Sequence, residues 1–264
     1  MALSNIKTWA LPRNFLQQIG WVLGILVFAF AIISAVERKG ASVVGKVEAD
    51  VIPLKGDDRL INEDNIKAVI LNSFGYELEG LKIEEVNLER LEQVLENEPF
   101  ILNADVYADG RSNIQIRVTQ RAPVLRIMGN NNQNYYLDKT GYQMPLSDLL
   151  AAKVLIATGN LAPYQEDFLD KKRNTLKDVF LLAEVIRADA FLNAMIEQIH
   201  VSNKGDMTLI PKLGNQKIIF GKLDNVENKF RRLKTFYKEA MPYEGWRKFE
   251  VIDLQYKNQV VCKR

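Results

Sequence analysis

Residues 101–120 read ILNADVYADGRSNIQIRVTQ and predict the β-hairpin that decides the fold of the first half of the chain. Two strands are expected, Ile101–Ala108 and Asn113–Gln120, joined by a turn over residues 109–112 in which Gly110 accepts a positive φ. Apolar residues alternate with polar ones along the second strand, and they are Ile114, Ile116 and Val118. Because alternate residues of a strand share a face, this strand buries one side.

Upstream of the hairpin, the sequence predicts one strand and two helices. Val43–Pro53 is rich in β-branched residues and favours the strand. Asn62 can cap the first helix, and Gly75 can supply a left-handed stop at its end. Asn87 begins the second helix and Pro99 ends it. The expected order of elements is therefore β-α-α-β-β.

Residues 43–120, with this order, resemble a POTRA domain, the polypeptide-transport-associated fold that docks other chains along a sheet edge. The charge of the region is uneven, since residues 48–109 hold 16 acidic and 5 basic residues, whereas residues 203–264 hold 7 acidic and 14 basic residues. That asymmetry suggests two modules with different contact surfaces, although a charged solvated face is the more common cause of such a bias.

After residue 120 the pattern changes to short strands and helices, which predicts a mixed α+β domain with an antiparallel-rich sheet. Aromatic strands are expected on both sides of residues 138–141, and the other expected strands are Val124–Met128, Val154–Ala157, a short one at Val201, Met207–Ile210 and Lys217–Phe220. Asp138–Gly141 fits a tight turn with glycine at the strained position. One helix is capped by Asn174.

A last helix is expected from about Asn225 to Met241, with Pro242 beyond its end. Asp224 and Glu227 stand where a capping box would place them. The chain then closes with residues 251–264, VIDLQYKNQVVCKR, which predict two strands hinged at Lys257-Asn258. A strand that ends a chain tends to lie at a sheet edge, where its unpaired backbone groups can template another chain.

Near the N-terminus, residues 19–36 read IGWVLGILVFAFAIISAV and carry no charge. As a helix they would extend about 27 Å at ~1.5 Å per residue, close to the ~30 Å of a bilayer core. Lys7 and Arg13 are the only charges before them, so the positive-inside rule keeps the N-terminus in the cytoplasm. A cleaved signal peptide is disfavoured because Ile33 stands at position −3 to Ala35.

The sequence therefore predicts a single-pass type II protein of the inner (plasma) membrane with a periplasmic C-terminal part. The expected division is residues 1–14 cytoplasmic tail, 15–36 transmembrane helix, 37–42 neck, 43–120 POTRA-like domain and 121–264 β domain.

Catalytic, cofactor and metal sites are not expected. His200 is the only histidine and Cys262 the only cysteine, so neither a usual zinc set nor an internal disulfide can form. His200 is also the only histidine that could serve a nucleophile, and its place between apolar neighbours favours an ordinary packed side chain. Cys262 is most simply read as a small apolar group on a strand face, with a redox-sensitive thiol as the alternative.

Nucleotides and nucleic acids are also disfavoured as ligands. Gly40–Lys46 has the spacing G-x-x-x-x-G-K, but Val47 stands where a phosphate-binding loop needs a hydroxyl. Removing Lys7 and Arg13 leaves 33 basic and 33 acidic residues in 37–264, which gives no electrostatic footprint for nucleic acid. With small-molecule chemistry weak, the modules are expected to present surfaces to other proteins.

Three stretches resemble the FtsQ/DivIB family of bacterial division proteins. QRAPVLRI (120–127) resembles the segment between its POTRA and β domains, where the family often has an acid in place of Gln120. YLDKTG (136–141) resembles its D-x-x-G hairpin, and IDLQY (252–256) resembles its D-L-R-Y strand with Gln255 replacing arginine. The departures loosen the motifs without changing the architecture.

The resemblance implies a non-enzymatic scaffold at the division septum with no cofactor. Known members recruit FtsB (DivIC) and FtsL, and the partner adds a strand to the last strand of the β domain; other division proteins are expected at the POTRA-like domain. By resemblance, Gln259–Lys263 is an edge left open for a partner. The partner-binding residues expected here are Tyr256, Asn258, Gln259, Val260, Val261, Cys262 and Lys263.

The chemistry of this stretch favours an acidic partner. Lys257, Lys263 and Arg264 are basic, and Tyr256 offers a large amphipathic side chain at the hairpin. The alternative functions are a POTRA-containing factor for polypeptide transport or outer-membrane assembly, and an anchored cell-wall hydrolase. The first is disfavoured because no transmembrane β-barrel pattern follows residue 120, and purified hydrolase activity would establish the second. A terminal strand that only completes its own sheet is the remaining reading of the edge.

Overall fold

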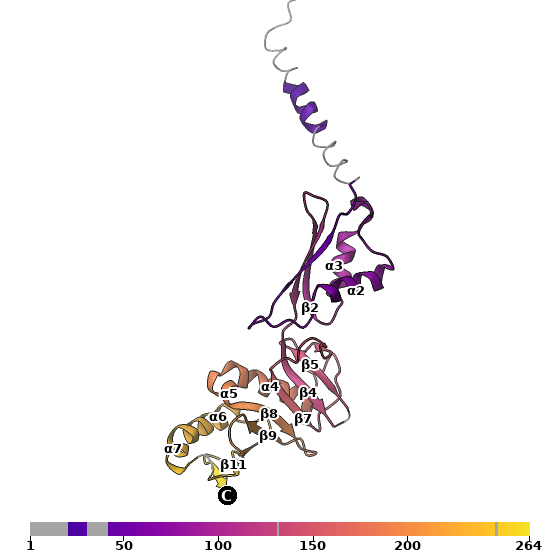
Figure 1. Ribbon diagram of the computed structural model, residues 1–264. Helices are drawn as coiled ribbons and strands as arrows, with labels where there is room; N and C mark the ends of the chain where they lie inside the picture. The colour runs from indigo at the N-terminus through magenta and orange to yellow at the C-terminus, as the bar shows by residue number, and fades with distance from the viewer. Residues whose placement is uncertain (1–20, 31–41, 131, 246–247) are drawn as a thin grey trace, which may run out of the picture.

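The computed structural model describes residues 21–30, 42–130, 132–245 and 248–264. Two sheets follow one another along the chain, one of three strands in the order β1-β3-β2 and one of nine in the order β12-β11-β10-β9-β8-β7-β4-β5-β6 (Figure 1). The smaller sheet comes first in sequence, and the C-terminus lies at the end of the larger sheet module remote from it (Figure 1). The expected α+β class is confirmed for the described residues.

The first module has the predicted order of strands and helices. Its elements are β1 (Val47–Ile52), α2 (Glu63–Phe74), the short 3-10 helix η1 (Ile83–Glu85), α3 (Leu88–Glu96), β2 (Ile101–Ala108) and β3 (Ile114–Gln120). β3 lies between a parallel β1 and an antiparallel β2. One core is formed by the inward faces of all three strands and both α-helices, with Leu91, Leu95 and Ile114 fully buried.

The caps of both α-helices lie where the sequence places them. Asn62 accepts the Asn65 N–H at 2.9 Å, and the Asn65 side chain accepts the Asn62 N–H in return. Gly75 ends α2 with φ 76, a conformation that costs glycine little because it has no Cβ. Asn87 caps α3 by accepting the Arg90 N–H at 2.9 Å. These local bonds satisfy backbone groups that a helix end leaves open.

The hairpin turn differs from the prediction in one residue. Ser112, and not Gly110, has a positive φ, at 66°. The Asp109 carboxylate explains the difference, since it accepts the N–H groups of Arg111 at 2.7 Å and Asn113 at 2.9 Å. This side-chain turn shapes the loop so that the left-handed residue comes two positions before β3 starts.

The second module is built on the nine-stranded sheet. Its strands are β4 (Pro123–Gly129), β5 (Asn134–Asp138), β6 (Gln143–Met144), β7 (Leu155–Gly159), β8 (Ile196–Val201), β9 (Met207–Pro211), β10 (Lys217–Gly221), β11 (Val251–Asp253) and β12 (Val261–Lys263). Five of the eight neighbouring pairs are antiparallel, as the sequence predicts for an antiparallel-rich sheet. The sheet ends at β12.

Helices between the strands supply the rest of the core. They are α4 (Thr175–Ala188), α5 (Ala190–Met195), α6 (Val226–Thr235), the π-helix η2 (Phe236–Ala240) and α7 (Met241–Glu244). Leu182 of α4 and Leu233 of α6 share one buried cluster with Ile199, Leu209 and Ile252 of the sheet. The Asn174 cap of α4 is confirmed by its bonds to the Leu176 and Lys177 N–H groups. Helix α5 was not expected from the sequence.

The last helical segment departs from the sequence prediction at both ends. Asn225 is the N-cap, with φ 46 and no side-chain capping bond, so the capping box expected at Asp224 and Glu227 is wrong. The Asp224 carboxylate instead pairs with the Lys229 ammonium, whose side chain is only 5% exposed. Pro242 was expected beyond the helix, but it lies in the first turn of α7, where its missing N–H costs nothing.

The predicted membrane anchor falls largely outside the described residues. So do the tail over 1–14 and the neck over 37–42, apart from Ser42. Residues 21–30 form a helix in which every side chain is exposed. Across the part of the chain that the structure describes, no helix is both long enough and apolar enough to cross a membrane.

The two modules meet at the junction between β3 and β4. Gln120 at the end of β3 is buried, and its Oε1 accepts the Leu60 N–H at 2.7 Å and the Ile61 N–H at 3.3 Å, while its Nε2 donates to the Ile52 carbonyl at 2.8 Å. Leu60 then packs on Tyr136 of the larger sheet. Gln120 therefore holds the Leu60 segment in place within the first module, and the small apolar cluster around Leu60 joins that module to the larger sheet.

Arg121 makes the second link of the junction. Its Nη1 donates to Asp138 Oδ2 at 2.8 Å, and its Nη2 donates to the Ile101 carbonyl at 3.3 Å. The other oxygen of Asp138 accepts the Thr140 N–H, the Thr140 hydroxyl and the Tyr142 N–H. Burial opposes the charge of Asp138, but these hydrogen bonds outweigh it and hold the pKa of the carboxyl below its usual value.

Candidate partner-binding edge

β12 is the terminal strand of the nine-stranded sheet. It pairs with β11 alone, in antiparallel register, with Val261 opposite Asp253, Cys262 opposite Ile252 and Lys263 opposite Val251. No strand within the described ranges lies on its other flank. A row of backbone groups on this flank is therefore available to another chain.

The hydrogen bonds of β11 tell which backbone groups of β12 face outward. Lys217 donates its N–H to the Glu250 carbonyl at 2.8 Å, and Leu254 donates its N–H to the Ile219 carbonyl at 2.9 Å. The even-numbered residues of β11 therefore face β10, so Val251 and Asp253 face β12. Their register partners are the odd-numbered residues of β12.

It follows that Val261 and Lys263 turn their N–H and C=O groups toward β11. The Lys263 carbonyl accepts the Glu250 N–H at 2.9 Å, so this carbonyl is directed to the β11 side; Glu250 precedes β11, and its N–H and C=O point to opposite neighbours. Because neighbouring residues of a strand alternate, the N–H and C=O of Cys262 point to the open flank. These are the groups that an added strand would meet first.

The side chains of the edge divide between the core and solvent. Val260 and Cys262 are half-buried and pack against the main core, whereas Lys263 is exposed. Burial raises the pKa of the Cys262 thiol, so the neutral form is held near neutral pH. Burial, and then the nearby Cys262, raise the pKa of Tyr237 to about 12. The thiol thus acts as a small packing group, as the sequence reading expects.

Arg232 of α6 holds the connection between β11 and β12. Its Nη2 donates to the Leu254 carbonyl at 2.8 Å, and its Nη1 donates to the Tyr256 carbonyl at 2.7 Å and to the Gln259 carbonyl. Its Nε donates to Asn228 Oδ1 at 2.9 Å, which fixes the guanidinium on the helix. One side chain therefore satisfies three carbonyls of a loop that has no regular structure of its own.

The turn residues complete the shape of the hairpin. Asn258 takes a left-handed conformation with φ 58, which asparagine tolerates better than most residues. Asp253 is buried, and its Oδ1 accepts the Gln255 N–H at 2.9 Å. Tyr256 is 48% exposed on the turn. The hinge at Lys257-Asn258 therefore lies where the sequence predicts it.

The structure brings the predicted site residues together but uses them unequally. β12 covers Val261–Lys263, which is shorter than the expected edge over Gln259–Lys263. The Gln259 carbonyl is already taken by Arg232, so this residue belongs to the turn rather than to the open flank. Arg232 was missed by sequence reasoning because it lies 22 to 27 residues before its acceptors and no motif links them.

The exposed charges at this end of the sheet are mostly positive. Lys257, Lys263 and Arg264 are exposed around the hairpin, and Glu250 is the nearby exposed acid. Within the described ranges, no group of three or more histidine, cysteine or acidic side chains could hold a metal ion. The arrangement can form backbone hydrogen bonds to an extended segment and attract acidic side chains on it.

Two family models match the chain, and each covers one of the two sheets. The model described as FtsQ/DivIB, C-terminal related, matches residues 122–263, more than half of the chain. The model described as POTRA-like domain matches residues 35–119. No curated protein matches the chain. Both family matches agree with the resemblances drawn from the sequence.

Proposed function

Since the chain belongs to the FtsQ/DivIB family, we propose that it is a membrane-anchored, non-enzymatic scaffold of the bacterial division machinery. Its β domain recruits division proteins of the FtsB/DivIC and FtsL type to the septum. The contact is made by a partner segment that adds one strand to β12. The proposed partner-binding residues are those expected from the sequence, Tyr256 and Asn258 to Lys263, with the backbone of Cys262 at the centre.

The open flank of β12 is the observation that supports this proposal. Cys262 directs its N–H and C=O groups away from β11, and no described strand lies on that flank of β12. An unpaired edge promotes unwanted association, so proteins usually blunt it with short strands, charges or bulges. β12 is only three residues long, and Lys263 and Arg264 are charged. Both features limit indiscriminate pairing and favour one acidic partner segment.

Arg232 gives the edge a fixed shape before the partner arrives. The loop from Leu254 to Gln259 is held by three carbonyl bonds to one guanidinium. Ordering a loop on binding costs free energy, and a loop that is already ordered avoids this cost. Tyr256, half exposed on the same loop, supplies an aromatic contact beside the added strand.

The membrane anchor and the septal location belong to the same proposal. The uncharged sequence over residues 19–36 and the exposed apolar helix over residues 21–30 support an anchor that holds the N-terminus in the cytoplasm. The two sheet modules would then lie outside the cytoplasm, where a single cysteine permits no internal disulfide. Loss of the protein should accordingly produce undivided filaments.

A truncation series tests the edge directly. A chain truncated after Asn258 lacks β12 and should no longer co-purify with an FtsB/DivIC-type partner. Its thermal unfolding transition should remain. A chain that stops at Lys263 keeps β12 intact and should retain the partner, which makes it the matched control. Retention of the partner by the shorter chain would refute the assignment of the edge.

A further inference from the structure

The three-stranded sheet has two edge strands, and only one of them is blunted. At the β2 edge, α3 supplies glutamates to the outward N–H groups: Glu92 Oε1 accepts from Val106 at 2.8 Å, and Glu96 Oε1 accepts from Ala104 at 3.4 Å. These carboxylates occupy the donors that a visiting strand would need. The β2 edge is therefore closed by the chain itself.

The β1 edge is closed only at its start. The Lys46 carbonyl accepts the Ile114 N–H at 2.8 Å. The backbone N–H and C=O groups of the even-numbered residues of β1 therefore face β3, and those of the odd-numbered residues face outward. Of the outward N–H groups, that of Val47 is bonded to Glu79 Oε1 at 3.1 Å. The N–H groups of Ala49 and Val51 have no hydrogen-bond acceptor among the described side chains and strands. The open part of this edge therefore starts after Val47.

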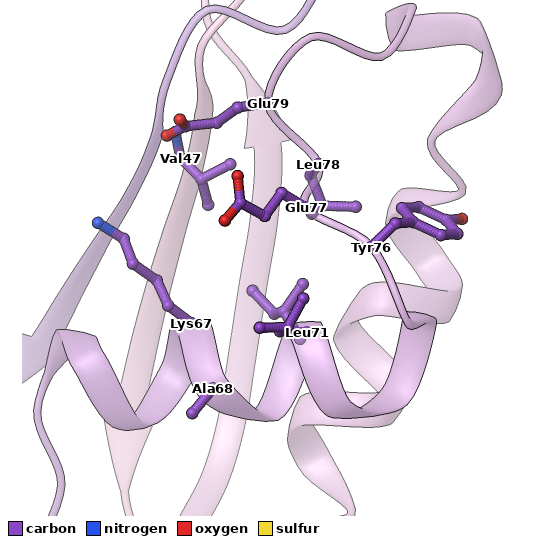
Figure 2. Close-up of a pocket in the computed structure, with 9 residues that line it drawn as sticks. Val47, Lys67, Ala68, Leu71, Tyr76, Glu77, Leu78 and Glu79 are labelled. Carbon is purple, nitrogen blue, oxygen red and sulfur yellow. The ribbon is translucent and has the colours of Figure 1, made fainter.

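A cavity lies next to this edge, between α2 and the segment over residues 76–79. It encloses about 270 Å³, and Leu71 and Leu78 contribute apolar surface to its wall. In Figure 2 the Lys67 side chain leaves α2 on the side of Val47 and Glu79, so the cavity is next to the start of β1. Leu71 is 46% exposed, which leaves apolar surface uncovered at the mouth.

The other face of β1 is acidic. Glu48 and Asp50 alternate with the inward residues and are exposed on the face of the sheet away from the helices. On the opposite side, next to α2 and the cavity, Glu63 is exposed and paired with Lys67 at 2.8 Å, and Glu77 is also exposed. A strand added beside β1 would place its alternate side chains toward Glu48 and Asp50 on one face and toward the cavity on the other.

We infer that the β1 edge is a second docking site, whose occupant is an extended segment of another protein in which basic residues alternate with apolar ones. The free N–H and C=O groups of Ala49 and Val51 bind its backbone. Lysine or arginine side chains on one face pair with Glu48 and Asp50 across the strands. An aliphatic side chain on the other face enters the cavity by Leu71. The role of this second docking site rests on the proposed scaffold function, but the site itself contains no residue of β12.

The test uses a fluorescent eight-residue peptide in which lysines alternate with valines around one central leucine. Its anisotropy is measured on titration with the purified full chain. We expect saturable binding that the same peptide with glutamates in place of lysines does not show. Ala49→Pro removes one outward N–H without removing a ladder bond, because proline is tolerated on that side of an edge strand. This variant should weaken binding by about tenfold or more, equivalent to ~1.4 kcal/mol.

Ala104→Pro is the control, because it removes an outward N–H at the β2 edge, where that N–H is already bonded to Glu96. Its affinity for the peptide should stay within about twofold, which is well below 1 kcal/mol. Hydrogen exchange of the backbone amides of the unaltered chain, measured with and without the lysine peptide, tests the site without any substitution. Slower exchange at Ala49 and Val51 on adding the lysine peptide is expected. A chain that stops at Asn258 should bind the peptide unchanged, which separates this site from the β12 edge.

Three results would each overturn the inference. The first is no binding of the lysine peptide, and the second is equal binding by Ala49→Pro and the unaltered chain with no protection at Ala49 and Val51. The third is protection of these amides that rises with chain concentration in the absence of peptide, which would identify a second copy of the chain as the occupant.

Discussion

Arg232 on α6 and Leu254 at the end of β11 are joined by a hydrogen bond of 2.8 Å from the Arg232 guanidinium to the Leu254 carbonyl. The same guanidinium reaches the Tyr256 carbonyl at 2.7 Å. The exit of β11, and hence the path of the chain into β12, is therefore fixed by a helix and not by the turn sequence alone. The shape of the proposed partner-binding edge therefore depends on a residue of a neighbouring helix.

Arg232→Ala should weaken partner binding more than it weakens the fold. Hydrogen bonds from a charged donor contribute about 1.5–3 kcal/mol each at most, and this side chain is partly exposed, so we expect a loss of about 1–2 kcal/mol in unfolding free energy. The partner affinity should fall by about tenfold because the loop must then be ordered on binding. Urea unfolding and titration calorimetry measure the two effects.

Arg231→Ala is the control for this change. Arg231 is the adjacent residue, is exposed, and makes no hydrogen bond or ion pair within the described residues. Its substitution should leave both measurements within about 0.5 kcal/mol. Equal affinity of the Arg232→Ala chain and the unaltered chain would show that the loop is ordered without the guanidinium.

Asp138→Asn should remove a pH-dependent part of the stability. The pKa of Asp138 is lowered, because hydrogen bonds from Thr140 and Arg121 outweigh its burial. Its contribution is therefore complete above the unfolded pKa of about 3.9 and is lost as the pH falls through the lower native pKa. We expect the variant to be less stable by about 2 kcal/mol at pH 7. The difference should shrink below about pH 4.

Urea titrations at a series of pH values from neutral to about 2.5 follow that difference across the window of the titration. Asp105→Asn is the matched substitution at an exposed aspartate and is measured in the same way. A stability difference between Asp138→Asn and the unaltered chain that stays constant with pH would contradict a role for the Asp138 charge in holding the junction.

Gln120→Ala should loosen the part of the first module that contacts the larger sheet through Leu60. The change leaves the Leu60 and Ile61 N–H groups and the Ile52 carbonyl without their partner in a buried site. Unpaired buried groups cost about 1–3 kcal/mol each, and partial access of water should limit the total to about 2–4 kcal/mol. Amide exchange should accelerate at Leu60 and Ile61 before the two cores open.

The matched variant is Gln115→Ala on the same strand. Gln115 donates to the exposed Glu48 carboxylate at 2.8 Å, so its loss should cost less than about 0.5 kcal/mol. If the two glutamine variants lost the same stability, the buried network of Gln120 would contribute nothing specific to the junction.

Cys262 should react slowly with iodoacetamide. Burial raises the pKa of its thiol, and only the thiolate attacks the reagent. As the only cysteine, it can be followed by mass without ambiguity. The midpoint of the rate against pH should lie above about 8.5, the ordinary value for cysteine. The chain in urea supplies the comparison, and equal rates for the folded and unfolded chains would show that the thiol does not pack against the core.

The first module could be predicted from the sequence because its signals are local. Asn62, Gly75 and Asn87 act on backbone groups within four residues, and the alternation along β3 needs no distant partner. The predicted position of the positive φ in the hairpin turn was wrong, because hydrogen bonds to the Asp109 carboxylate, and not the glycine, determine the conformation of the turn.

The second module was harder because its decisive contacts connect distant residues. Asp224 pairs with Lys229 and does not cap the helix as its position suggested. A π-helix over Phe236–Ala240 follows Thr235 and leads into α7, which contains Pro242. The open flank of β12 could be expected from its place in the chain. The outward direction of the Cys262 backbone follows only from the hydrogen bonds of β11 with β10, which no sequence pattern reports.

The central claim is that the outward backbone of β12 binds the partner, and a pair of substitutions at Cys262 tests it most directly. Cys262→Pro removes the outward N–H but no bond to β11, whereas Cys262→Val keeps the N–H and a similar apolar side chain. The affinity of each full chain for an FtsB/DivIC-type partner is measured by titration calorimetry. We expect the valine variant to bind and the proline variant to lose at least about tenfold in affinity, with both variants folded. Equal binding by the two would contradict it.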